Sequence, residues 1–163
     1  MNETLITLLV LGIVTGGVTV YVLNYKPMRK SKVKDLYAEG LDLLITGRRK
    51  SAYKNFKDII QQDSDNIKAY LRLGQVLREG GNPLQALKIH KKLLHRKDLM
   101  YYEQIELHKN LALDYYKIGN ISNAIGELHT LLKIEKNSEW ALSQLITFYR
   151  EQQDWKKAGE HFA

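Results

Sequence analysis

The chain has 163 residues and a formal net charge of +7, from 25 Lys and Arg against 18 Asp and Glu. It contains no cysteine, which excludes disulfides, thiol nucleophiles and zinc knuckles. The nucleotide-binding motif GxxxxGKS/T, the metalloprotease motif HExxH and the hydrolase motif GxSxG are also missing. We therefore expect no catalytic residue, no metal site and no cofactor in this chain, and we do not predict an enzyme.

Part of the positive charge lies near the N-terminus. Five of the 25 cations but only two of the 18 acids precede residue 36, which leaves 20 − 16 = +4 for the remainder. A net charge of only +4 spread over these residues predicts ordinary solvated helix surfaces and no nucleic-acid partner. The five N-terminal cations are Lys26, Arg29, Lys30, Lys32 and Lys34.

The first predicted element is a membrane helix. The 19 residues from Leu5 to Leu23 carry no charge, and at about 1.5 Å per residue a helix of this length spans roughly 30 Å of hydrocarbon. A cleaved signal peptide is the less favoured alternative, because no cation precedes the apolar stretch. We expect residues 1–25 to form a single-pass anchor that ends near Pro27, and residues 26–35 to form a basic juxtamembrane linker. Because the cations follow the span, the rest of the chain is predicted to face the cytoplasm.

Gly12 and Gly16 lie four residues apart within the predicted span, with Thr15 and Thr19 close to the same face. A small-xxx-small pair of this kind permits tight packing against another membrane helix. Glycine is common in membrane helices, so the alternative is that the pair makes no specific contact.

Beyond the linker, three small residues recur with a shift of 34 positions, since Gly40, Gly47 and Ala52 reappear as Gly74, Gly81 and Ala86. This period is typical of the tetratricopeptide repeat (TPR), a helix-turn-helix unit that buries its apolar face by stacking on its neighbours. The corresponding positions of two further units are Ala112, Gly119 and Ala124, then Ile146, Gln153 and Ala158. We predict an all-α TPR solenoid over residues 36–163, with repeats at about 33–65, 66–98, 99–137 and 138–163, the last one incomplete.

Details of the pattern refine this register. The step from Ala86 to Ala124 is 38 residues, so four extra residues lie around 98–102, and the first helix of the third unit is expected to begin early. Helix caps are predicted at Asn82, Asn120 and Asp154, with Pro83 at a first helical position and a weaker start at Arg48. Core positions at helical spacing are Leu43, Phe56, Ile59, Leu73, Leu77, Leu93, Leu94, Leu111, Tyr115, Leu128, Leu131, Leu145, Tyr149 and Phe162.

Histidines and carboxylates have ordinary explanations. His90 falls on a packing position, and His95 is five residues away, which does not align the pair on one helix face. We expect core or surface histidines rather than metal ligands. Asp63 and Asp65 lie beside Asn66 in a turn between repeats, where capping accounts for them.

The predicted functional surface is the concave groove that the first helix of each unit lines in this architecture. Sixteen positions are expected there: Lys34, Tyr37, Leu41, Leu44, Lys68, Leu71, Gln75, Arg78, Glu106, Lys109, Leu113, Tyr116, Trp140, Ser143, Thr147 and Arg150. Aromatic residues and arginine most often anchor protein interfaces, and Arg78 or Lys109 would meet an acidic partner segment. The alternative is that Leu41, Leu44, Leu71 and Leu113 only pack against neighbouring repeats.

The segments Tyr37–Phe56, Leu73–Leu94 and Tyr101–Ile125, together with the apolar N-terminus and its basic exit, resemble the lipopolysaccharide assembly protein B family. The resemblance implies a bacterial inner-membrane TPR adaptor whose repeats face the cytoplasm. It also implies partners: the membrane protease FtsH, the lipid A deacetylase that the adaptor presents to it, and lipopolysaccharide assembly proteins. By the same resemblance, Gly12 and Gly16 become candidates for contacts with partner membrane helices.

Family members continue into further repeats and a metal-holding rubredoxin-like module, and this chain carries neither. The resemblance therefore predicts an N-terminal fragment, and the metal-dependent part of the family's function is not expected of these residues. A generic membrane-anchored TPR scaffold or targeting receptor stays open as the alternative function.

Overall fold

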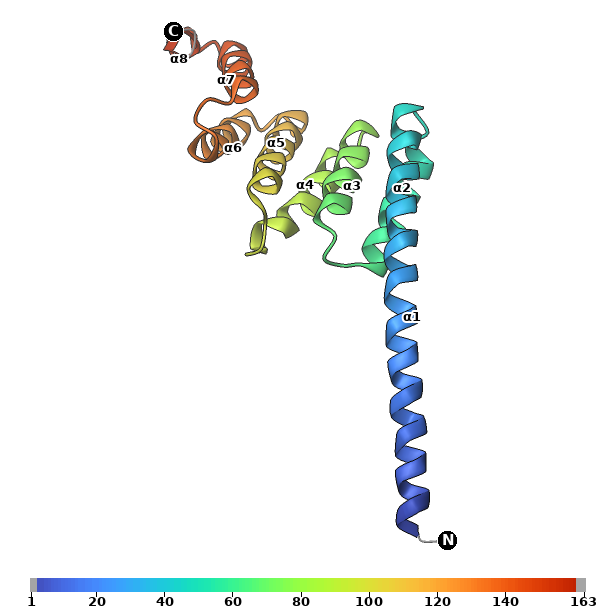
Figure 1. Ribbon diagram of the computed structural model, residues 1–163. Coiled ribbons are helices and arrows are strands. Elements are labelled where there is room, and N and C mark those ends of the chain that lie inside the picture. The colour runs from blue at the N-terminus through green and yellow to red at the C-terminus, as the bar shows by residue number, and fades with distance from the viewer. Residues whose placement is uncertain (1–2, 161–163) are drawn as a thin grey trace.

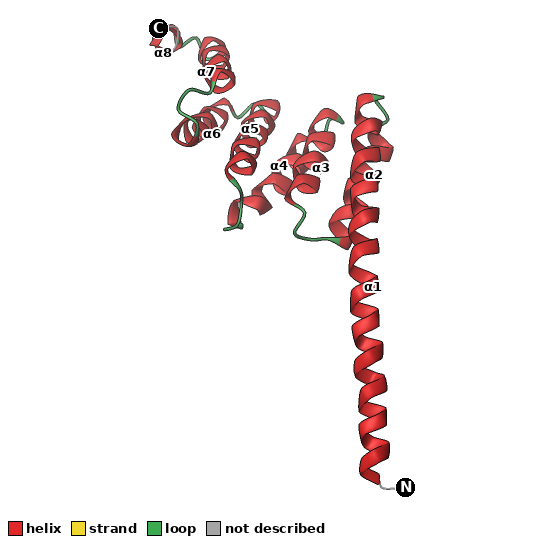
Figure 2. Cartoon of the chain, in the orientation of Figure 1, coloured by secondary structure: helices red, strands yellow, loops and turns green. Residues whose placement is uncertain are grey.

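The computed structural model describes residues 3–160, while residues 1–2 and 161–163 and the side chains of residues 4, 5, 22–31 and 160 lie outside that description. The predicted core residue Phe162 and the isolated His161 fall among those not described. Across residues 3–160 every element is helical and no strand is present (Figure 2). The elements are α1 (Glu3–Ile45), α2 (Arg49–Gln62), α3 (Ile67–Glu79), α4 (Pro83–Lys91), the 3-10 helix η1 (Lys92–His95), α5 (Tyr101–Ile118), α6 (Ile121–Ile134), α7 (Glu139–Glu151) and α8 (Trp155–Glu160).

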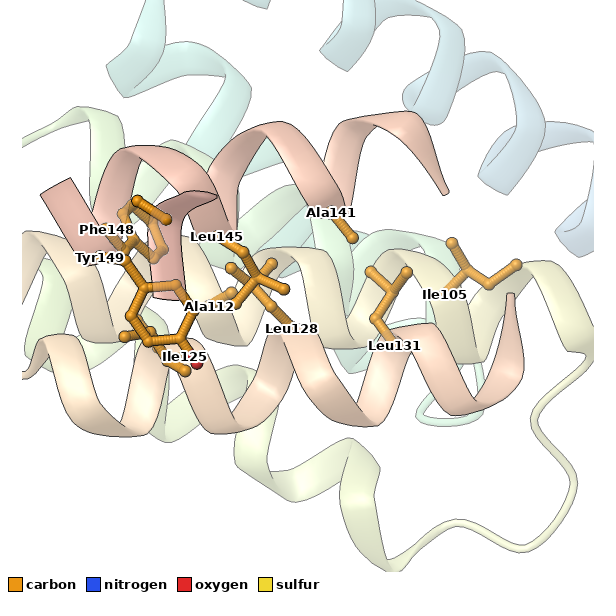
Figure 3. Close-up of a cluster of buried hydrophobic side chains, with 11 residues drawn as sticks. Ile105, Ala112, Ile125, Leu128, Leu131, Ala141, Leu145, Phe148 and Tyr149 are labelled. Atoms are coloured by element: carbon orange, nitrogen blue, oxygen red, sulfur yellow. The ribbon is translucent and has the colours of Figure 1, made fainter. Parts of the chain in front are cut away.

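Successive helices pack as four hairpins, α1 with α2, α3 with α4, α5 with α6 and α7 with α8, and each hairpin stacks on the next (Figure 1). This confirms the predicted all-helical TPR-like solenoid. The hairpins share three clusters of buried side chains instead of one central core. Figure 3 shows the cluster between α5, α6 and α7, where Leu128 and Leu145 are fully buried. Each unit therefore depends on its neighbours for cover.

Glycine is required where the two helices cross in the first and in the second hairpin. A Cβ atom on Gly40 would lie 2.8 Å from Cζ of Phe56, and one on Gly74 would lie 2.2 Å from Nε2 of His90. Both distances are too short for real side chains, so these crossings accept no residue larger than glycine without a shift. Alanine serves in the second helix of each hairpin, where Ala52, Ala86, Ala124 and Ala158 are buried.

The turn inside each hairpin has the same backbone conformation four times. Gly47, Gly81 and Gly119 have φ angles of +73°, +85° and +85°, in the left-handed region that favours glycine. In the fourth unit Gln153 occupies the same position with φ of +60°. The structure thus confirms the landmark register, although its last turn is made by a residue that adopts this conformation less readily.

Helix starts agree with the sequence except at one cap. The side chains of Asn120 and Asp154 accept hydrogen bonds from the amides of Asn123 and Lys157, each at 3.2 Å. The Asn82 side chain makes no cap hydrogen bond, although Pro83 begins α4 as expected.

The connection into the third hairpin differs from the others. Helix α5 has 18 residues against 13 in α3 and α7, so it begins early as the 38-residue step predicts. Its first turn is capped by Glu103, whose Oε2 accepts from the backbone N–H of Met100 at 3.1 Å. The prediction of a core position at Leu94 is wrong, because this side chain is 44% exposed. It lies in the 3-10 turn η1, where the helical spacing behind the prediction no longer holds.

Helix α1 runs without interruption from the N-terminal region into the first hairpin. The expectation that the helix ends near Pro27 is wrong, since residues 26–35 are helical as well. A proline inside a helix removes one backbone hydrogen bond, and the helix continues on either side of it. Within the residues that the structure describes, no helix is both long enough and apolar enough to cross a membrane. The membrane anchor thus stays a prediction, whose two ends, Leu5 and Val22–Leu23, lie among the side chains that are not described.

Candidate partner-binding face

The candidate site is the stripe of side chains along the first helix of each hairpin, α1, α3, α5 and α7, which we call the helix-A face. The sixteen positions named from the sequence repeat at spacings of three and four residues, and such spacings place side chains on one side of a helix. What the structure adds is how these side chains meet across neighbouring hairpins.

Between α3 and α5, one contact on this face is a cation over an aromatic ring. The Lys68 ammonium lies 5.5 Å from the centroid of the Tyr102 ring. Gln75, further along α3, accepts a hydrogen bond from Arg72 at 2.7 Å and donates one to Glu79 at 2.9 Å. Gln75 is therefore held within its own helix.

At the far end of α3, Arg78 enters a buried polar network. Its Nη1 donates to Oδ1 of Asp114 at 2.8 Å and to Oδ1 of Asn110 at 3.0 Å. The Arg78 side chain is 8% exposed and that of Asp114 is completely buried. A buried carboxylate is tolerated only when charged or donor groups surround it, and here they come from α3, α4 and α5.

The second oxygen of Asp114 faces His90, whose Nδ1 lies 2.5 Å from Oδ2. On the other side of the ring, Nε2 of His90 lies 3.2 Å from the carbonyl oxygen of Leu71. Both contacts are hydrogen bonds only when both ring nitrogens carry a proton. The prediction that His90 is a packing residue is confirmed, and its polar atoms tie α4 to both α3 and α5.

Between α5 and α7 the contacts are aromatic. Lys109 lies 5.6 Å from the centroid of the Trp140 ring and 3.6 Å from Glu106. The Tyr116 ring stacks on Phe148 at 4.6 Å, and its hydroxyl donates to Oε1 of Glu151 at 2.7 Å. That hydrogen bond, with a smaller contribution from burial, raises the pKa of Tyr116.

Two of the predicted binding residues belong to the interior. Leu71 is buried against Leu93 and Leu111, so its proposed role in a groove is wrong and the packing alternative is right at this position. Arg78 forms a buried ion pair with Asp114, so its guanidinium is not available to an acidic segment of a partner. Tyr37 is half-buried, with its ring edge-on to Phe56 at 5.6 Å.

Other positions on this face are accessible. Lys68 and Arg150 are exposed, whereas Leu113 and Trp140 are half-buried. A hollow of about 410 Å³ lies elsewhere on α4, but on the helix-A face a hollow of about 260 Å³ opens at the end of α7. It is lined by Thr147, Arg150, Glu151 and Trp155.

Sequence reasoning missed three residues of this region. Trp155 begins α8 and is 63% exposed, and its place beside Arg150 comes from the tight turn at Gln153. Asp114 and Asn110 went unnoticed because each is polar within an otherwise apolar helix face. A charged residue at such a position, between Leu111 and Tyr115, is the signal that could have found the network.

No group of three or more metal-ligating side chains occurs in the part of the chain that the structure describes. Nδ1 of His108 lies 2.7 Å from Oε2 of Glu127, and Nε2 of His129 lies 3.0 Å from the Tyr149 hydroxyl.

Known proteins resemble this chain in sequence and in fold. No family model matches the chain. Lipopolysaccharide assembly protein B of Escherichia coli strain K12 is 27% identical over 122 residues, which cover 75% of this chain and 31% of that protein. The Haemophilus influenzae protein of the same name is 27% identical over 136 residues, covering 78% of this chain and 34% of its own length. The chain is thus similar to lipopolysaccharide assembly protein B over about three quarters of its length. It spans about a third of the length of these curated relatives.

Solved structures show that the fold of this chain is that of a TPR array. MamA from Desulfovibrio magneticus RS-1 has a TM-score of 0.69 with 19% identity, over 80% of this chain and 71% of that one. A tetratricopeptide repeat protein from Parabacteroides merdae has a TM-score of 0.68 with 21% identity, over 81% and 51%. YrrB, described as a TPR protein with an unusual peptide-binding site, has a TM-score of 0.61 with 17% identity, over 79% and 64%.

Proposed function

We propose that this chain is a membrane-anchored adaptor in lipopolysaccharide assembly, which holds protein partners on its helix-A face and performs no chemistry itself. The observation that carries this proposal is the similarity to lipopolysaccharide assembly protein B over three quarters of the chain, on a fold that serves as a binding scaffold. In the finer form of the proposal, the adaptor presents the lipid A deacetylase to the membrane protease FtsH and contacts other lipopolysaccharide assembly proteins.

Anchoring is supported by the N-terminal part of α1. Every side chain from Ile6 to Tyr21 is exposed, and a helix that is apolar all round requires cover from protein or lipid. Its polar hydroxyls are already satisfied, since Thr15 donates to the Leu11 carbonyl at 2.9 Å and Thr19 to the Thr15 carbonyl at 2.7 Å. In the hydrocarbon region of a bilayer no water is present to bond these hydroxyls, so such internal hydrogen bonds are favourable there.

Orientation and helix packing complete the anchor proposal. The similarity to lipopolysaccharide assembly protein B favours the bacterial inner membrane. Cations follow the apolar segment and none precedes it, which favours an orientation with the array on the cytoplasmic side. A Cβ atom added at Gly12 or Gly16 would meet nothing within 4 Å, so this face has room for the close approach of a partner's membrane helix.

Partner binding is supported by the accessible end of the helix-A face. The hollow at α7 and α8 combines a cation, Arg150, with the exposed ring of Trp155. Arginine and tryptophan are enriched among residues that dominate interface energetics. YrrB, which shares the fold, carries a peptide-binding site, and a peptide segment of a partner suits a hollow of this size.

The anchor is tested by fractionation of the tagged chain expressed in Escherichia coli. The chain is expected to stay in the membrane pellet after carbonate extraction, because a spanning helix is removed only by detergent. Val10→Glu combined with Val14→Glu should release the chain, whereas Thr46→Glu, which lies in the exposed turn after α1, should not. Release of the unaltered chain by carbonate would rule out the anchor.

The adaptor function is tested by the lifetime of the deacetylase in a pulse-chase experiment. Deleting the gene should slow its decay, and Arg150→Ser combined with Trp155→Ser should do so in part, because both side chains are exposed and their loss leaves the fold intact. Lys50→Ser, on the exposed part of α2, is the matched control and should leave the decay unchanged. Unchanged decay after gene deletion, with mislocalised complexes, would instead support the scaffold alternative.

A further inference from the structure

Residues 91–102, which run from the last residue of α4 through η1 to the first two residues of α5, carry a concentration of exposed apolar side chains, and we call this stretch the α4–α5 connection. Beyond residue 32, seven large apolar side chains are exposed among the described residues, and four of the seven lie between residues 94 and 102. The connection also contains the four residues that lengthen the step between repeats. The four exposed side chains are Leu94 (44%), Met100 (59%), Tyr101 (59%) and Tyr102 (42%).

The same connection is basic. It contains Lys91, Lys92, Arg96 and Lys97 against one acid, Asp98. A neighbouring hollow of about 410 Å³ is lined by the first two of these lysines and by Leu84, Leu87, Lys88 and His95, with no carboxylate among them. Alternating basic and apolar side chains of this kind are typical of surfaces that lie against anionic membranes.

Two contacts place the connection at one end of the array. Arg96 donates to Oδ1 of Asp65 at 2.5 Å and to the carbonyl oxygen of Ser64 at 2.6 Å, which ties it to the loop after α2. Ile59, near the C-terminal end of α2, belongs to a buried cluster against which Val33 of α1 also packs. The connection therefore lies along the edge of the row of hairpins from which the N-terminal part of α1 projects (Figure 1).

We propose that the α4–α5 connection is a second membrane contact, in which Leu94, Met100 and Tyr101 enter the headgroup region of an anionic bilayer while Lys92 and Lys97 meet lipid phosphates. This inference rests on the proposed anchoring through α1. Tyrosine at the interface and lysine near anionic headgroups are the residue types that such a surface uses.

Distances along α1 permit this contact. Val33 follows Leu23 by ten residues, which is about 15 Å of helix. The headgroup region reaches roughly 6 Å beyond the hydrocarbon on each side, so a gap of about 9 Å remains. Two successive repeats displace the connection sideways by about 20 Å. A typical helix tilt of about 20° lowers a point at that distance by about 7 Å, and the length of the side chains covers the rest. Attachment at two points would fix the orientation of the helix-A face above the bilayer.

The test uses single cysteines labelled with the fluorophore NBD in the full chain, which has no cysteine of its own. The labelled variants are Met100→Cys, Val14→Cys in the apolar helix, and Ile45→Cys at the opposite end of the first hairpin, where the native side chain is 85% exposed. The chain is reconstituted in vesicles of phosphatidylethanolamine and phosphatidylglycerol that contain doxyl-labelled lipid. We expect doxyl quenching at Val14 and at Met100, and none at Ile45.

Each outcome separates the connection from the anchor. Quenching at Val14 without quenching at Met100 overturns the second contact and leaves the anchor in place. Quenching at Met100 without quenching at Val14 supports the contact as a peripheral one and overturns the anchor. Blue-shifted emission at Met100 without lipid quenching assigns the surface to a protein partner or a second copy, and overturns the lipid contact.

Charge provides the second measurement. Lys92→Gln combined with Lys97→Gln should lower the ratio of docked to undocked chain, reported by Met100 quenching, by about five-fold for each cation at low salt. The matched control, Lys50→Gln combined with Lys117→Gln, removes the same charge from exposed positions outside the connection and should leave the quenching unchanged. Equal quenching in all these variants, or in vesicles of phosphatidylcholine alone, would exclude recognition of anionic lipid.

Discussion

At the scale of single residues, Asp114 is a buried carboxylate at which side chains from three helices meet. A fully buried carboxylate is stable only with partners, and Asp114 has Arg78 on one oxygen and His90 on the other. Because those partners belong to α3 and α4, one side chain of α5 connects three helices. The network also withdraws Arg78 from the predicted partner-binding residues.

We predict that Asp114→Ala destabilises the array by about 3–5 kcal/mol, because it leaves the buried Arg78 and His90 without their carboxylate. Urea unfolding followed by circular dichroism measures this loss. The control is Asp65→Ala, which removes the ion pair with Arg96. The Asp65 side chain is 76% exposed, so this change should cost less than about 1 kcal/mol. Similar losses for the two variants would show that the buried network contributes no more than a surface pair.

Gln153 is the second residue with a clear expected effect. Its φ angle of +60° is unfavourable for a residue with a Cβ atom, and glycine occupies the same position in the other three hairpins. Gln153→Gly should stabilise the last hairpin by about 0.5–1 kcal/mol, since relief of the backbone strain exceeds the added entropy of the unfolded chain. Gln152→Gly, at a φ angle of −79°, relieves no strain and should be neutral or destabilising in the same thermal unfolding measurement. Equal effects of the two changes would contradict the strain argument.

Acid pH should loosen the start of α8 through Asp154. A hydrogen bond from the Lys157 ammonium, followed by one from the Lys157 amide, lowers the pKa of this carboxyl below its ordinary value. The stabilisation is therefore present above the ordinary pKa of aspartate and is lost as the pH falls through the lowered value. Amide exchange of Lys157 and Ala158 should accelerate on acidification relative to the intrinsic rates. Asp154→Asn should remove this extra pH dependence.

At the scale of elements, the helices are joined by close crossings that two glycines make possible. Gly74 faces His90 so closely that an added methyl group displaces the imidazole from its bonds with Asp114 and Leu71. The α3–α4 crossing and the buried polar network are consequently one structural unit. A change in the helix distance disturbs both.

Gly74→Ala is expected to destabilise the array by about 1–3 kcal/mol through overpacking. Gly126→Ala provides the matched control inside α6, because a Cβ atom there meets nothing within 4 Å. The control should stabilise by roughly 0.5–1 kcal/mol, the ordinary gain of replacing glycine by alanine in a helix. Chemical unfolding of both variants tests the comparison, and a stabilising Gly74→Ala would contradict the close crossing.

At the scale of the whole molecule, the array is a row of hairpins in which each contacts mainly its neighbours. Stability in such a row is uneven, because terminal units have one neighbour and central units have two. The central hairpins also hold the buried network of Arg78, His90 and Asp114. Opening should begin at the end of the described array, where α8 has only six residues.

Native-state hydrogen exchange measures this gradient. Amides of α3, α4 and α5 should exchange most slowly, and those of α7 and α8 fastest within the array. Asp114→Asn should accelerate exchange in all three central helices together, because it weakens a network that they share. Acceleration limited to α5 would show that the network does not couple the helices.

The sequence by itself determined the repeat register. Gly40, Gly74 and Ala112 could be placed because a helix crossing and a left-handed turn each demand a small residue at a fixed spacing, and that requirement is local. The same reasoning located the early start of α5 and assigned His90 to a packing position. It failed at Pro27 and at Leu94. Proline is a local signal for a helix end, but α1 continues through Pro27, and the helical spacing that predicted a core position at Leu94 is interrupted by the 3-10 turn η1.

Only the tertiary structure decided which side chains of the helix-A face are available. Leu71 and Arg78 have the spacing of groove residues, but a stripe on one helix is also the side that approaches the next hairpin. Whether a side chain at that boundary faces solvent or a neighbour depends on the distance between helices, and here Asp114 and Leu93 come from α5 and η1 to cover them. Helical periodicity specifies on which side of its own helix a side chain lies. Whether that side is buried depends on the position of the neighbouring helix, which packing decides.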